Sequence, residues 1–267
     1  MSHRISRHRV DEELVRQGFF KDADTAMRAV LSGDVSTTNR KILSAGELVP
    51  EGIYLQVKGA PVYVSRGGLK LERAFEAFQL DVVQKRCLDI GCSTGGFTDC
   101  LLQYGAALVT SVDVGYAQFD WSLRNDDRVE LLERTNVVNL PQLGYNDVFD
   151  VAVSDVSFTS VITILPAVLE VLKQDGIFVT LVKPQFEAKK EDVGAGGIVT
   201  DPTVRLQVLQ NVTSAFTDAK LGPLGACESP IHGAKGNVEY LLFGQCNAEP
   251  RQLNLQSVVY EHSVQII

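Results

Sequence analysis

The chain has 267 residues, of which 45% are hydrophobic and 22% are charged. A chain of this length and apolar content can fill one large core and a small second one, which excludes a wholly disordered protein. Its longest apolar segments, residues 161–172 and 177–182, are shorter than the roughly 20 residues that a membrane helix needs. The first ten residues are polar and basic, unlike a secretory signal, so the sequence predicts a cytoplasmic protein.

The charges are unevenly distributed along the chain. The net charge of -8 argues against a polyanionic partner for the protein as a whole. Residues 1–70, however, carry eleven Lys and Arg against eight Asp and Glu, so the acidic excess lies in the rest of the chain. A basic amino-terminal module on an acidic body is expected when one part docks nucleic acid and the other binds a cationic cofactor.

The five cysteines are an odd number, and none belongs to a Cys-x-x-Cys pair. This pattern predicts reduced, mostly buried thiols. Cys92 is the one thiol that can be argued to be a nucleophile, but no histidine lies near it in the sequence. We therefore favour a structural role for Cys92.

The amino-terminal region shows helical spacing at residues 10–17 and 22–31, which predicts two short helices. Three short segments with alternating apolar residues follow and predict strands: residues 35–38, 47–49 and 53–57. Residues 4–59 are therefore expected to form a small α+β domain. Residues 60–66 are expected to be a linker to the next domain.

In the remainder of the chain, apolar runs that end in polar residues alternate with helical patterns, which is typical of parallel strands in a doubly wound α/β sheet. Five such strands are predicted: residues 87–90, 107–113, 129–132, 148–155 and 176–183. After a helix at 203–216, two strands near 224–228 and 238–243 are close enough to form an antiparallel pair. The sequence thus predicts a Rossmann-like α/β domain at residues 67–246. The role of the tail, residues 247–267, is unknown.

The segment LDIGCSTGGFT, residues 88–98, runs from a strand end through a glycine turn into a helix start. Glycines let a backbone approach a ligand closely. The segment lacks the Gly-x-Gly-x-x-Gly spacing that holds a dinucleotide pyrophosphate, and it contains no Lys or Arg. Instead, Asp89 lies at one strand end and Asp113 at the next. Two acids suit a ligand with an ammonium group and a ribose, which favours S-adenosylmethionine.

We expect Asp113 to bind the ribose hydroxyls of this cofactor, and Asp89 to fix the loop and interact with the methionine end. Strand-end capping remains an alternative for either acid alone. The residues predicted to contact the cofactor are Asp89, Gly91, Ser93, Thr94, Gly95, Gly96, Phe97, Asp113, Asn136 and Asp155. For Asn136, a turn cap is as good an interpretation as a cofactor or RNA contact. For Phe158, a core aromatic is as good an interpretation as such a contact. Trp121 can flank an adenine or anchor packing, and we assign His232 no role.

Four ionisable residues beside glycine, proline or a strand end are expected to assemble into one site: Lys70, Asp155, Lys183 and Glu239. Two lysines and two carboxylates suit an enzyme that makes a sugar hydroxyl nucleophilic, because a lysine near a second cation loses its proton more easily. Taken singly, each can instead be half of a solvated surface pair that contributes ~0 to 1 kcal/mol.

Seven ordered motifs carry a family resemblance. They are VSRGGLKL at 64–71, the loop at 89–98, VDVGY at 112–116, ERTN at 133–136, SDVSF at 154–158, LVKPQFE at 181–187 and GAKGNVEY at 233–240. Together they closely resemble the TlyA family, and the resemblance covers about residues 4–245. That family, historically called haemolysin A, contains ribosomal RNA 2'-O-methyltransferases with an S4-type RNA-binding domain before an FtsJ-like catalytic domain.

The resemblance implies transfer of a methyl group from S-adenosylmethionine to the ribose 2'-hydroxyl of a cytidine in ribosomal RNA. Lys70, Asp155, Lys183 and Glu239 match the catalytic tetrad of this superfamily. The hydroxyl must lose its proton as it attacks the methyl group, so a nearby base helps. We expect Lys183 to be that base and Lys70 to ease its proton loss and steady the alkoxide. The two acids would orient the lysines and the cofactor, and no metal is required.

The resemblance also implies that residues 4–59 dock RNA or a ribosomal subunit. The candidate phosphate contacts are Arg4, Arg7, Arg9, Arg28, Arg40 and Lys41. One alternative is a non-catalytic RNA-binding factor in ribosome assembly, which a degenerate tetrad would have favoured. A membrane-active haemolysin is the other, and it would require an amphipathic or spanning segment and an export signal.

Overall fold

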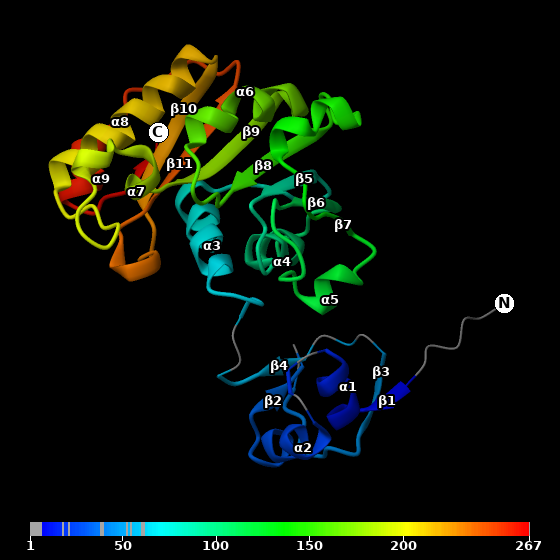
Figure 1. The fold of residues 1–267 in the computed structure, drawn as a ribbon. Coiled ribbons are helices and arrows are strands. Elements are labelled where there is room, and N and C mark those ends of the chain that lie inside the picture. The colour runs from blue at the N-terminus through cyan, green and yellow to red at the C-terminus, as the bar shows by residue number, and fades with distance from the viewer. Residues whose placement is uncertain are drawn as a thin grey trace. The chain divides into compact units, whose positions relative to one another are not determined.

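The computed structural model divides into two compact units, Met1–Val62 and Tyr63–Ile267. The residues that it describes are 7–17, 19–20, 22–37, 40–51, 53, 55–59 and 62–266 (Figure 1). The division falls within the predicted linker, residues 60–66. No helix in these described ranges is long and apolar enough to cross a membrane.

The first unit is a small α+β fold around its own apolar core. Its elements are β1 (Arg7–Arg9), α1 (Val10–Arg16), α2 (Ala23–Leu31), β2 (Val35–Ser36), β3 (Leu48–Pro50) and β4 (Gln56–Val57). Strand β1 pairs with β3 and β2 pairs with β4, both antiparallel. Leu14, Val30 and Ile42 are fully buried between these elements. Asp22 begins α2 as a cap, because its carboxylate accepts a hydrogen bond from Thr25 N at 2.7 Å.

Both predicted helices and the three predicted strands of this unit are present in the described residues. Strand β1 was not predicted, since its sequence Arg-His-Arg has no apolar alternation. Its pairing with β3 makes it a strand, and this partner lies about 40 residues away in the chain. The predicted strand at 35–38 ends at Ser36, and residue 38 lies outside the described residues.

The second unit contains an eight-stranded sheet with the strand order β12-β10-β11-β9-β8-β5-β6-β7 (Figure 1). Its strands are β5 (Arg86–Ile90), β6 (Leu108–Val112), β7 (Val129–Leu132), β8 (Phe149–Ser154), β9 (Leu172–Val182), β10 (Leu221–Glu228), β11 (Tyr240–Cys246) and β12 (Gln265–Ile266). Strands β5 to β9 are parallel, whereas β11 is antiparallel to both β9 and β10. The Rossmann-like sheet and its antiparallel final pair are therefore confirmed.

Helices pack on both faces of this sheet (Figure 1). They are α3 (Gly67–Phe78), α4 (Gly96–Gln103), α5 (Trp121–Arg124), α6 (Val161–Val171), α7 (Pro184–Glu187), α8 (Pro202–Asp218) and α9 (Leu255–Tyr260). Short 3-10 turns are η1 (Val137–Asn139), η2 (Pro141–Leu143), η3 (Lys190–Asp192) and η4 (Ala234–Gly236). One core layer joins α6, α8 and α9 to the sheet around Phe178 and Phe216, and the other joins α3 and α4 around Phe75 and Phe97.

Two parts of this unit differ from the sequence prediction. Strand β9 begins at Leu172, directly after α6, whereas the predicted strand began at residue 176. Residues 173–175 are polar, so the apolar pattern did not include the first part of the strand. The tail at 247–267 is not separate from the domain. Its helix α9 buries Val258, and β12 adds a short strand beside β10 through Gly225 and Ala226.

Candidate active site

Gly91 brings two strand ends into close contact at the carboxyl edge of the parallel sheet. It follows β5 with a φ of 80°, a left-handed conformation that favours glycine, and its N–H donates to Val112 O at 2.8 Å. A Cβ atom at this position would lie 3.1 Å from the backbone oxygen of Asp155. The glycine therefore lets the loop after β5 lie against the residues that follow β8.

Gly95 and Gly96 are required by packing within the protein. A Cβ atom on Gly96 would lie 2.3 Å from Ser65 Oγ and 2.9 Å from Gly68 N, so α4 can approach the start of α3 only with glycine here. A Cβ atom on Gly95, which has a φ of 96°, would lie 2.5 Å from Leu123 Cδ1. The sequence interpretation assigned these glycines to ligand approach. Their close contacts are with other parts of the chain, and the contact at Gly96 helps to fix the helix that carries Lys70.

Two cavities lie side by side at this edge of the sheet. The larger one has a volume of about 630 Å³ and is lined by strand ends and loops that follow β5, β6, β7 and β8. The smaller one, about 270 Å³, is lined by the start of α3, the glycine loop and residues 231–233. Gly91, Ser93 and Asp155 line both cavities. Thr94, Gly96 and Phe97 line the smaller cavity.

Asp113 and Asn136, two of the residues predicted to contact the cofactor, both line the larger cavity. Asp113 accepts hydrogen bonds from Ser93 N at 2.8 Å and from Gly115 N at 2.7 Å. Each carboxylate oxygen retains lone-pair capacity for a further donor, such as a hydroxyl. The Asn136 side chain accepts from Val138 N at 3.2 Å, so it is also the turn cap that the sequence allowed.

Asp89 lies beneath the glycine loop and is fully buried. Its Oδ2 accepts a hydrogen bond from Thr98 Oγ1 at 2.6 Å, which ties the strand end to the first turn of α4. Its Oδ1 has no hydrogen-bond partner among the residues that the structure describes. Burial raises the pKa of the Asp89 carboxyl to about 7, and the nearby Asp155 adds to this effect. Asp89 lines neither cavity, and its hydrogen bond with Thr98 fixes the loop.

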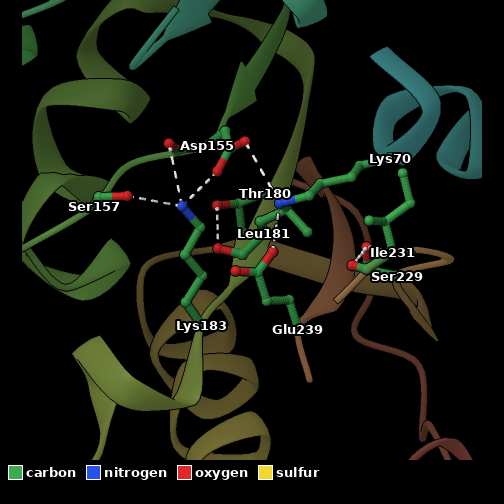
Figure 2. Close-up of polar contacts among 9 residues, drawn as sticks. All are labelled: Lys70, Asp155, Ser157, Thr180, Leu181, Lys183, Ser229, Ile231 and Glu239. Atoms are coloured by element: carbon green, nitrogen blue, oxygen red, sulfur yellow. Dashed lines mark hydrogen bonds and ion pairs between the residues drawn. The ribbon is translucent and has the colours of Figure 1, made fainter. Parts of the chain in front are cut away.

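The structure brings the four ionisable residues of the predicted tetrad together (Figure 2). Lys70 Nζ lies 2.6 Å from Glu239 Oε2 and 3.9 Å from Asp155 Oδ2. Lys183 Nζ lies 2.5 Å from Asp155 Oδ1. The charges therefore alternate in the order Glu239, Lys70, Asp155, Lys183. Each lysine faces carboxylate oxygens, and Asp155 lies between the two ammonium groups.

These four side chains come from elements that are far apart in the sequence. Lys70 lies on α3, Asp155 follows β8, Lys183 follows β9 and Glu239 precedes β11. Their exposed side-chain fractions are 12% for Lys70, 22% for Asp155, 8% for Lys183 and 3% for Glu239. The alternative that these are solvated surface pairs is therefore wrong. Buried charges of this kind need their partners, because removal of one leaves an uncompensated charge.

Ser157 is a member of the cluster that the sequence interpretation missed. Lys183 Nζ donates a hydrogen bond to Ser157 Oγ at 3.0 Å, on the far side of Lys183 from Lys70 (Figure 2). The available signal was a hydroxyl residue two positions beyond the strand-end Asp155. Such a residue can point to the same side of the chain as the acid.

Several other predicted residues have defined positions around the cavities. Cys92 is buried and lines the smaller cavity, and burial raises the pKa of its thiol, which disfavours a nucleophilic thiolate. Four of the five cysteines are buried, and all five are free thiols, as predicted. Phe158 is 91% exposed and lines the larger cavity, so its interpretation as a core aromatic is wrong. Trp121 is 71% exposed and lines a separate hollow with Tyr116.

The candidate RNA contacts lie in the first unit, and five of the six are described and exposed. Arg28 lies on α2, and Lys41 forms a backbone bridge with Ser36. The other three are engaged within the unit: Arg7 donates to Leu48 O at 2.8 Å, Arg9 pairs with Asp11 at 2.6 Å, and Arg40 pairs with Glu47. Arg4 lies outside the described residues.

A Rossmann-like sheet with a strand-end acid and a glycine loop, next to a buried Lys-Asp-Lys-Glu cluster, defines a class of enzyme. It is the class of FtsJ-like methyltransferases, and the family model of that description matches residues 63–246.

Comparison with known proteins narrows this class to one family. Hemolysin A of Brachyspira hyodysenteriae is 42% identical over 87% of this chain and 98% of its own length. The 16S/23S rRNA (cytidine-2'-O)-methyltransferase TlyA of Mycobacterium tuberculosis is also 42% identical, over 89% of each chain. A solved structure of a Streptococcus thermophilus protein with a hemolysin designation superposes with a TM-score of 0.71 at 39% identity, over 97% and 96% of the two chains. The chain belongs to this TlyA family of FtsJ-like methyltransferases.

Proposed function

We propose that this protein transfers a methyl group from S-adenosylmethionine to the ribose 2'-hydroxyl of a cytidine in ribosomal RNA. The observation that carries the proposal is the alternating cluster of half-buried Lys70 and Asp155 with buried Lys183 and Glu239, at the junction of two cavities. The cytidine and the ribosomal RNA come from the printed activity of the Mycobacterium tuberculosis relative. A ribosomal substrate would imply a cytoplasmic location, which is part of this proposal.

The larger cavity suits the cofactor in size and in chemistry. Its volume of about 630 Å³ is in the range of small-molecule sites. Among the described residues that line it there is no lysine or arginine, whereas Asp113 and Asp155 supply negative charge for a cationic ligand. Asp113 would hold the ribose hydroxyls, and apolar residues such as Val137 and Ile164 would pack on the adenine. S-adenosylmethionine bound there supplies an electrophilic methyl group.

The smaller cavity would then receive the target ribose. Lys70 and Asp155 line it, and Arg66 and His232 lie at its wall. Lys183, in its neutral form, would take the proton from the 2'-hydroxyl. Asp155, at 2.5 Å, would stabilise the ammonium group that forms, and Ser157 Oγ would fix its direction by accepting one hydrogen bond.

Lys70 would act through its charge. Glu239 holds the Lys70 ammonium at 2.6 Å, which fixes a positive group beside the place where the alkoxide develops. Both lysines contact Asp155, so this role of Lys70 fits the geometry better than direct repulsion of Lys183.

The first unit would dock ribosomal RNA as an S4-like domain. Its exposed basic side chains, such as Arg28 and Lys41, would contact phosphates and so contribute salt-dependent affinity. Contacts of this kind position the enzyme and carry little sequence information, so selection of the cytidine would depend on the catalytic unit.

The test is an in vitro methylation assay. Purified protein and radiolabelled S-adenosylmethionine are incubated separately with small and large ribosomal subunits, and labelled nucleotides are mapped by nuclease digestion. We expect label in 2'-O-methylcytidine. Cofactor binding without label on either subunit would overturn the proposal in favour of an assembly factor.

A further inference from the structure

Two loops carry the residues on both sides of the Lys183 ammonium group. The loop at 155–160 follows β8 and supplies Asp155 and Ser157, and the segment at 183–188 follows β9 and supplies Lys183. Strands β8 and β9 are paired neighbours up to Ser154 and Thr180. Beyond these residues the two loops are held together by side chains.

Glu187 makes a second connection between these loops, away from the tetrad. Its Oε2 accepts a hydrogen bond from Ser160 Oγ at 2.5 Å, and its Oε1 accepts one from Val161 N at 2.7 Å. Between the two ends, the rings of Phe158 and Phe186 lie 5.2 Å apart. The loops are therefore joined at the tetrad, in the middle and at Glu187.

The environment of Glu187 makes this connection strong. Its carboxylate lies at the amino terminus of α6, where a helix has unpaired N–H groups and a positive dipole end. Ser160 Oγ meanwhile accepts from Ile162 N at 3.1 Å, so the first two N–H groups of α6 are satisfied, one by each side chain. Hydrogen bonds to an ionised carboxylate are shorter and stronger than neutral ones. Burial raises the pKa of Glu187 above its usual range, and the two hydrogen bonds oppose this shift.

The tetrad does not use Glu187, and a helix cap alone does not require a residue from the loop that carries Lys183. Ser160 already caps α6. The carboxylate instead anchors the chain four residues after Lys183 to the chain five residues after Asp155. Lys183 is thus held from both sides, by β9 before it and by Glu187 after it.

We propose that Glu187 is a positioning residue for methyl transfer, which holds Lys183 in register with Asp155 and Ser157 by anchoring its loop to Ser160 and the start of α6. This inference rests on the proposed function. A misplacement of about 1 Å by a distant change can cost about a hundredfold in rate. Loss of this anchor should therefore lower kcat while the binding of cofactor and subunit changes little.

The test compares Glu187→Ala and Glu187→Gln with a matched control, Glu191→Gln, which alters an exposed glutamate four residues further on. For each variant, kcat and KM for the ribosomal subunit, the Kd of S-adenosylmethionine and the melting temperature are measured. We expect Glu187→Ala to lower kcat roughly tenfold or more. Glu187→Gln retains an acceptor for Val161 N and a partner for Ser160, so it should recover most of the rate. The control should equal the wild type.

A double variant tests whether Glu187 acts through Ser160. If it does, Ser160→Ala and Glu187→Ala together should lower kcat less than the product of their separate effects, because they break one connection. A lower melting temperature with unchanged kcat in folded Glu187→Ala would overturn the proposal and leave a purely structural cap. If Glu187→Ala does not fold, Glu187→Gln is the decisive variant. The proposal predicts that Glu187→Gln keeps most of the wild-type rate, so a kcat as low as that of a variant without the base, Lys183→Ala, would overturn it. Wild-type protein that binds cofactor but methylates no subunit would instead refute the proposed function.

Discussion

The tetrad of the catalytic unit and the Arg40–Glu47 pair of the first unit use paired charges in opposite ways. In the catalytic unit, Lys183 and Glu239 are almost completely buried, at 8% and 3% exposure. In the first unit, Arg40 also pairs with a carboxylate, that of Glu47, but these two side chains remain 56% and 27% exposed. Buried charges depend on their partners for stability, whereas exposed ones exchange a partner for water or for a phosphate at little cost. The same pairing can therefore fix a reaction centre in one unit and leave a surface free to bind in the other.

Lys183→Ala removes a buried charge from the tetrad and should have the largest effect on activity. We expect the rate of methylation to fall by about 10² to 10⁴, because general base catalysis contributes this much. The Kd of S-adenosylmethionine should change little, since Lys183 does not line the larger cavity and is proposed to act on the 2'-hydroxyl only as the methyl group is transferred. Steady-state kinetics and calorimetry measure the two quantities. The matched control is Lys189→Ala, an exposed lysine on the same segment, and activity of Lys183→Ala equal to that control would refute the base assignment.

Glu239→Ala tests the cost of an unpaired buried charge. Its removal deprives Lys70 of the partner at 2.6 Å, so we expect a loss of about 3 kcal/mol in the free energy of unfolding. Denaturant unfolding measures this loss. Changing Lys70 to Met in the same protein removes the stranded charge and should restore part of the stability. No recovery in the double variant would show that Glu239 stabilises the unit by other contacts.

Asp89→Asn tests how a buried carboxyl without a cationic partner among the described residues makes the stability of the catalytic unit depend on pH. The folded pKa of Asp89, about 7, lies above the ordinary value of 3.8, so the folded state binds this proton more tightly than the unfolded state does. Asp89 therefore costs increasing stability as the pH rises from about 4 to 7. We expect the stability of Asp89→Asn relative to wild type to increase over this window and to level off above it. Parallel unfolding curves across the window would contradict the buried, protonated carboxyl.

Arg40→Ala should have the smallest effect on stability. Its partner Glu47 is also partly exposed, so the melting temperature should be almost unchanged. If Arg40 contacts a phosphate, the affinity for the ribosomal subunit should fall and the slope of log K against log salt should decrease by about one. Filter binding over a salt series measures both. The control is Lys173→Ala, which removes a surface charge from the catalytic unit. Lys173 is likewise paired with a carboxylate, that of Asp150.

The sequence was most informative where the signal is local. Apolar runs that end in polar residues predicted the parallel strands, and β7 (Val129–Leu132) has the bounds that were expected. The tetrad could be predicted because each member belongs to a recognisable motif. Strands β1 and β12 could not, since each is only two or three residues long and becomes a strand through its partner.

The less predictable features of the site depend on tertiary contacts. Nothing in the sequence shows that Gly96 lies against Ser65, or that Asp155 separates the two lysines. Ser157 and Glu187 are ordinary polar residues until β8 and β9 bring their loops together. The motifs therefore selected the four members of the tetrad, and the structure shows which of them lie in contact.

The short strand β12 also affects how copies of this protein behave toward one another. Within the described residues it pairs with two residues of β10, Gly225 and Ala226, at one margin of the sheet, and the four-residue β7 forms the other margin. Long, flat sheet edges are templates for strand pairing between molecules, and short ones are poor templates. We therefore expect these two short margins to disfavour edge-to-edge pairing between copies of the protein.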